Sequence, residues 1–157
     1  MKNLTIASLL TLLVSMGAWA EEDMISLNEY MDRQVNLDSN NLYYVYARCS
    51  AINYNVNALS KNSEKFKDSL AMPSRLGFEK FYVEAGMVLA SISGKNIEED
   101  KENLKATVTG MIDEYTTMSN KLYLKTGSYF TETMTEDLAL CNGIYEDFEK
   151  WKLGNWL

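Results

Sequence analysis

The sequence contains no histidine among its 157 residues, and it has only one proline and two cysteines. Histidine is the base in Ser-His-Asp and Cys-His sites and a common ligand of zinc and haem. Its absence excludes these sites, and it also excludes di-iron carboxylate bundles, which need Glu-x-x-His motifs. We therefore expect no metal, no cofactor and no catalytic residue. An enzyme that works with carboxylates, or with a lone Tyr or Lys, is the weakest functional hypothesis, because nothing in the sequence places two acids across a cleft.

Basic residues are also scarce relative to acidic ones. The chain has 15 Lys and Arg residues against 22 Asp and Glu residues, which gives a net charge of −7. Non-specific binding of nucleic acid and docking on anionic lipid both depend on clustered Lys and Arg. The composition therefore argues against nucleic acid and against a lipid surface as partners.

The first twenty residues have the pattern of a secretory signal peptide. Lys2 precedes an uncharged, mostly apolar run over residues 4–17, and Ala18-Trp19-Ala20 forms an A-x-A cleavage pattern. The alternative is an uncleaved N-terminal anchor, but the run is shorter than the roughly 20 residues that span a membrane. We predict a bacterial Sec-type signal over residues 1–20 that is cleaved after Ala20. The protein is then periplasmic or secreted, without stable membrane insertion.

The remaining residues, 21–157, are expected to form a single helical domain. A short helix is predicted over about 26–34, and residues 62–73, which include the only proline, are expected to be a connection. Apolar residues recur at helical spacing over four longer segments, which we predict as helices at about 39–61, 74–93, 97–125 and 131–153. Short connections between amphipathic helices are typical of an all-α, antiparallel four-helix bundle.

The two cysteines fall on the apolar seams of the first and last long helices. In an up-and-down bundle these helices are neighbours, and an exported protein meets an oxidising compartment. We therefore predict one disulfide between Cys49 and Cys141. The alternatives are two buried free thiols or a redox or metal pair, although redox cysteines usually lie close together, as in C-x-x-C.

Arg48 is a candidate for a buried charge, since it lies next to Cys49 on the 39–61 helix. Glu84 lies between Phe81 and Val88 on the apolar side of the 74–93 helix. An inward Arg48–Glu84 pair would act as a buried specificity device or as the floor of a polar site. The alternative is a partly exposed arginine whose aliphatic stem covers apolar surface.

Aromatic residues supply the candidate binding surface. Tyr43, Tyr44 and Tyr46 are too close in sequence to face one core together, so some of them lie at its boundary or on the surface. They form either a partner-binding face or a set of boundary tyrosines with their hydroxyls in water. Trp156, beyond Gly154, either caps the end of the bundle or docks on a partner.

Two functional hypotheses follow. The first is a non-enzymatic protein-interaction module of the bacterial envelope, such as an inhibitor, adaptor or chaperone-like protein, whose protein partner the sequence does not identify. The second is a carrier of a small apolar ligand, with a cavity in the bundle core and Arg48 as a polar contact.

Overall fold

The computed structural model describes residues 24–36, 38–61 and 67–154, and the side chains of all of these except residues 67–72 and 150–154. The described chain is helical and contains no strand, which confirms the all-α class. Its five helices are α1 (Leu27–Asp32), α2 (Ser39–Lys61), α3 (Lys67–Ser93), α4 (Ile97–Thr126) and α5 (Glu132–Gly154). The predicted signal peptide and Trp156 lie outside the described residues.

Local capping sets several of the helix boundaries. The Ser26 hydroxyl accepts a hydrogen bond from the Glu29 amide at the start of α1. Asn96 caps α4 by accepting from the Glu99 amide at 3.0 Å. Gly127 closes α4 with a left-handed φ of 75°, which glycine adopts without steric penalty. The sequence shows these caps in advance because they depend on neighbouring residues.

The start of α3 differs from the prediction. Residues 67–73, expected as part of a connection, are helical, and Pro73 lies inside the helix. Proline removes one backbone hydrogen bond and crowds the preceding turn, which argued for a helix that begins after it. The packing of α3 against α2 stabilises the helix by more than the proline destabilises it, since tertiary contacts dominate helix stability in proteins.

Helix α2 is buried on several faces rather than along one seam. It contacts α3, α4 and α5, and Leu42 near its start is 40 % exposed. Buried positions include Ser50, Asn53 and Asn55, whose side chains donate to the backbone carbonyls of Phe78, Cys49 and Ile112 respectively. Because each of these polar groups has a partner, the helix tolerates them in the interior.

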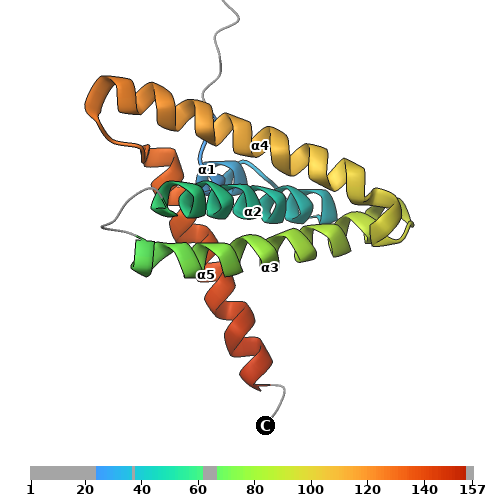
Figure 1. The fold of residues 1–157 in the computed structure, drawn as a ribbon. Helices are drawn as coiled ribbons and strands as arrows, with labels where there is room; N and C mark the ends of the chain where they lie inside the picture. The colour runs from blue at the N-terminus through green and yellow to red at the C-terminus, as the bar shows by residue number, and fades with distance from the viewer. Residues whose placement is uncertain (1–23, 37, 62–66, 155–157) are drawn as a thin grey trace, which may run out of the picture.

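The long helices are not all aligned. Figure 1 shows α2, α3 and α4 lengthwise beside one another, while α5 runs steeply across them. The contacts agree, because α2, α3 and α4 touch one another and α5 contacts α1 and α2. The helical class is therefore established, and a regular antiparallel packing of four helices stays a prediction.

A close contact between α2 and α3 depends on Gly77. A Cβ atom at this position would lie 2.5 Å from Oδ1 and 2.8 Å from Cγ of the buried Asn53. We expect Gly77→Ala to lower the free energy of unfolding by about 1–3 kcal/mol, because the overpacked contact forces Asn53 to shift. Urea unfolding followed by circular dichroism measures the change.

The matched control is Gly110→Ala in α4, where an added Cβ meets nothing within 4 Å. This substitution is expected to raise the free energy of unfolding by about 0.4–1 kcal/mol, because alanine favours the helix and restricts the unfolded chain. Equal effects of the two substitutions would contradict the role given to Gly77.

Candidate functional site

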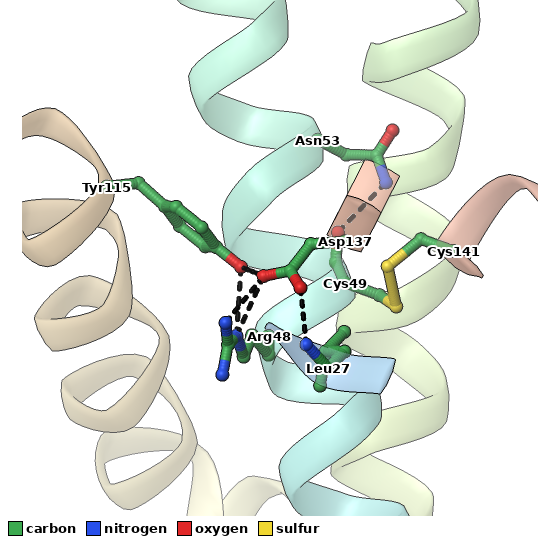
Figure 2. Close-up of a disulfide and its surroundings, with 7 residues drawn as sticks. All are labelled: Leu27, Arg48, Cys49, Asn53, Tyr115, Asp137 and Cys141. Atoms are coloured by element: carbon green, nitrogen blue, oxygen red, sulfur yellow. Dashed lines mark hydrogen bonds and ion pairs between the residues drawn. A yellow bond between two sulfur atoms is a disulfide. The ribbon is translucent and has the colours of Figure 1, made fainter. Parts of the chain in front are cut away.

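A buried ion pair joins α2 and α5. Arg48 of α2 and Asp137 of α5 are both fully buried. The Arg48 guanidinium donates to Asp137 Oδ2 from Nη2 at 2.6 Å and from Nε at 3.0 Å. Figure 2 shows the two side chains pointing toward each other.

Two tyrosines also form hydrogen bonds with this pair. The Tyr115 hydroxyl of α4 donates to Asp137 Oδ2 and accepts from Arg48 Nε at 3.0 Å. The Tyr44 hydroxyl accepts from Arg48 Nη1 at 3.1 Å. A buried ion pair is tolerated when its remaining donors and acceptors are bonded. Among the described residues, no buried side-chain nitrogen or oxygen lacks a partner.

The same two charges also bind the backbone at the start of α1. The Ile25 carbonyl accepts from Arg48 Nη2, and the Leu27 amide donates to Asp137 Oδ1 at 2.5 Å. The Leu27 side chain is fully buried. The cluster therefore joins four parts of the described chain, namely the N-terminal segment, α2, α4 and α5.

The disulfide lies beside this cluster and confirms the predicted pairing. Cys49 and Cys141 are bonded, with Cα atoms 5.5 Å apart. Cys49 follows Arg48 directly, and Cys141 lies one helical turn after Asp137. The covalent bond and the ion pair therefore connect α2 and α5 at adjacent points (Figure 2).

The surroundings of Arg48 and Tyr115 keep each of these side chains in a single protonation state. Burial by itself would lower the pKa of Arg48, but Tyr115 and Asp137 outweigh it and raise that pKa above its usual range. Burial raises the pKa of Tyr115 well above 10, Arg48 opposes this rise, and Asp137 adds to it. Arg48 therefore stays charged and Tyr115 stays protonated near neutral pH, which suits a structural role better than proton transfer.

The predicted Arg48–Glu84 pair is wrong. Glu84 binds Lys80 of its own helix, with Nζ and Oε1 2.5 Å apart, and its side chain is 18 % exposed. Lys80 lies one turn earlier on α3, so Glu84 has a local partner, whereas Arg48 is covered by α5. The alternative of a partly exposed Arg48 is also wrong, because Arg48 is 0 % exposed.

The three candidate tyrosines of α2 are half-buried and pack against the core. Tyr44 lies against Tyr30, with ring centroids 4.4 Å apart, in addition to its bond with Arg48. Tyr46 contacts Phe81 and Phe148, and burial raises its pKa. These positions fit boundary tyrosines better than a free aromatic face.

Sequence reasoning missed Asp137 as the partner of Arg48 because it paired Arg48 with Glu84 instead. A signal was nevertheless present. Asp137 lies three residues after Met134 and four before Cys141, so it occupies a regular position on the apolar seam of α5. An acid on a seam, one turn from a bridging cysteine, predicts a buried charge that needs a cation.

Three exposed apolar side chains lie on one face of α3. Leu76, Val83 and Met87 are 42 %, 55 % and 44 % exposed. They follow one another at spacings of seven and four residues, so they share one stripe of the helix.

Two open hollows of about 320 Å³ each flank the N-terminal turn of α5. One includes Lys121 and Lys125, and the other includes Glu29, Glu132 and Glu136. Over the described ranges, no group of His, Cys, Asp or Glu side chains is arranged to hold a metal ion. Within the same ranges, no helix combines the length and apolar character needed to span a membrane.

No family model, curated protein or solved structure matches the chain.

Proposed function

We propose that this protein is an exported, non-enzymatic protein-interaction module, of the adaptor, inhibitor or chaperone-like kind. The observation that carries the proposal is the exposed stripe of Leu76, Val83 and Met87 on α3. Single exposed apolar residues are ordinary on protein surfaces, but apolar residues gathered on one face are typical of interaction sites. The binding surface proposed here is thus on α3, in place of the tyrosines of α2.

The interior supports a scaffold rather than a catalyst. The disulfide and the Arg48–Asp137 pair fix α5 on α2, and the donors of Arg48 are used within the protein. A rigid scaffold lowers the entropy lost when a surface binds a partner. Export is proposed from the signal pattern of residues 1–20 together with a disulfide, which is typical of oxidising compartments.

The alternative of an apolar-ligand carrier has less support. Arg48, its proposed polar contact, is already bonded to Asp137, Tyr115, Tyr44 and the Ile25 carbonyl. The two hollows beside α5 are open to solvent, and charged side chains contribute to the lining of both.

Site-specific photo-crosslinking in cells tests the proposal. A photoreactive residue at Val83 is expected to give a discrete adduct, whereas one at the exposed Lys105 of α4 is expected to give none. Met87→Glu should abolish the Val83 adduct, because it places a charge on the same stripe. No adduct at Val83, or the same adducts at both positions, would count against an interaction surface on α3.

A further inference from the structure

The segment of residues 24–36, which contains α1, packs onto the long helices as a distinct unit, and we call it the N-terminal latch. Its Leu27 side chain is fully buried, and its Tyr30 ring lies against Tyr44. The Tyr30 hydroxyl also donates to Asn41 Oδ1 at 2.8 Å. The latch therefore rests on α2 through side chains.

The backbone of the latch is held by two opposite charges at once. Its Ile25 carbonyl needs the guanidinium of Arg48, and its Leu27 amide needs the carboxylate of Asp137. These charges belong to different helices and are 89 residues apart in the sequence. The latch thus binds a site that exists only while α2 and α5 stay together at this point.

The disulfide is the covalent connection at that point. Cys49 follows Arg48 directly, and Cys141 lies one turn after Asp137, so the disulfide is close to both charged residues that hold the latch (Figure 2). Helix α5 crosses α2 steeply instead of packing along its length (Figure 1). Contact between the two helices is therefore local, and the covalent bond has a large influence on whether Arg48 and Asp137 meet.

We propose that formation of the Cys49–Cys141 disulfide closes the N-terminal latch. The bond forms by thiol–disulfide exchange with a disulfide oxidant, either a protein or a small molecule. The two cysteine thiols give up two electrons and two protons, and the oxidant leaves as two thiols. In the dithiol state α5 separates from α2 at the crossing point, and the latch loses its backbone partners. Oxidation then brings Arg48 and Asp137 together, and the latch packs onto α2 and α5.

Hydrogen–deuterium exchange resolved by peptide tests this proposal on the full purified protein. We compare the oxidised protein with the same protein in dithiothreitol and with the Cys49→Ser/Cys141→Ser variant. Exchange in residues 24–33 is expected to quicken by about tenfold or more when the disulfide is absent. Residues 104–119 of α4 lie in the core and report global unfolding, so in the dithiol state residues 24–33, which open locally, should exchange faster than residues 104–119. Unchanged protection of residues 24–33, or exchange of residues 24–33 no faster than that of residues 104–119 in the dithiol state, would overturn the proposal.

A second variant tests the geometry while the disulfide stays intact. Asp137→Asn removes the negative charge at the latch site, so it is expected to quicken exchange in residues 24–33 as reduction does. The control Glu146→Gln changes an exposed acid on the same helix and should leave the latch protected. Protection of the latch in Asp137→Asn equal to that in Glu146→Gln would also overturn the proposal.

Discussion

Loss of the Cys49–Cys141 disulfide is expected to lower the free energy of unfolding by about 4–5 kcal/mol. The bond joins residues 92 positions apart, so it removes much of the freedom of the unfolded chain. Urea unfolding of the oxidised protein and of Cys49→Ser/Cys141→Ser, followed by circular dichroism, measures the difference. A loss of this size is a large share of the stability of a typical domain.

Dithiothreitol supplies the control for this prediction. It should shift the unfolding midpoint of the wild-type protein and leave the double-serine variant unchanged, because that variant has no disulfide to reduce. A wild-type protein with the same unfolding midpoint in both redox states would show that α2 and α5 are held together by their packing alone.

Asp137→Asn is expected to lower the free energy of unfolding by about 3–5 kcal/mol. The substitution leaves the Arg48 guanidinium fully buried without its counter-charge. It also weakens the acceptor for the Leu27 amide and the Tyr115 hydroxyl. Urea unfolding of the oxidised protein, with the disulfide present in every variant, measures this effect separately from that of the covalent bond.

Two further variants make this measurement specific. Glu146→Gln removes an exposed acid from the same helix and is expected to change stability by less than about 0.5 kcal/mol. The double variant Arg48→Met/Asp137→Leu removes both charges. Its loss of free energy of unfolding should be smaller than the sum of the losses caused by Arg48→Met alone and by Asp137→Leu alone. Additive losses would show that Arg48 and Asp137 stabilise the fold independently of each other.

The helices were predictable where their signals are local. The prediction of 39–61 for α2 matches Ser39–Lys61, and that of 97–125 for α4 differs from Ile97–Thr126 by one residue. Asn96 and Gly127 mark the ends of α4 through contacts with residues only a few positions away. The disulfide was predictable because only one intramolecular pairing of two cysteines exists.

The buried partner of Arg48 depended on information that local patterns do not contain. Glu84 and Asp137 both lie at positions from which a side chain can point into the core, so local patterns allow either one to pair with Arg48. Which of them does so depends on which helix covers Arg48. Helix α5 crosses α2 steeply (Figure 1), and its Asp137 points toward Arg48 of α2 (Figure 2). The burial of Asn53 and Asn55 also depends on tertiary packing. Because several helices pack around α2, little of its surface faces solvent, and polar residues on it become buried.

The disulfide also has a consequence for what a protease can remove. Cys49 and Cys141 enclose the whole of α3 and α4 within a covalent ring. A single cut anywhere in that ring opens it but leaves both pieces attached through the sulfur atoms. The cut chain therefore stays one molecule, and its parts reassemble at the effective concentration of a tethered pair instead of diffusing apart.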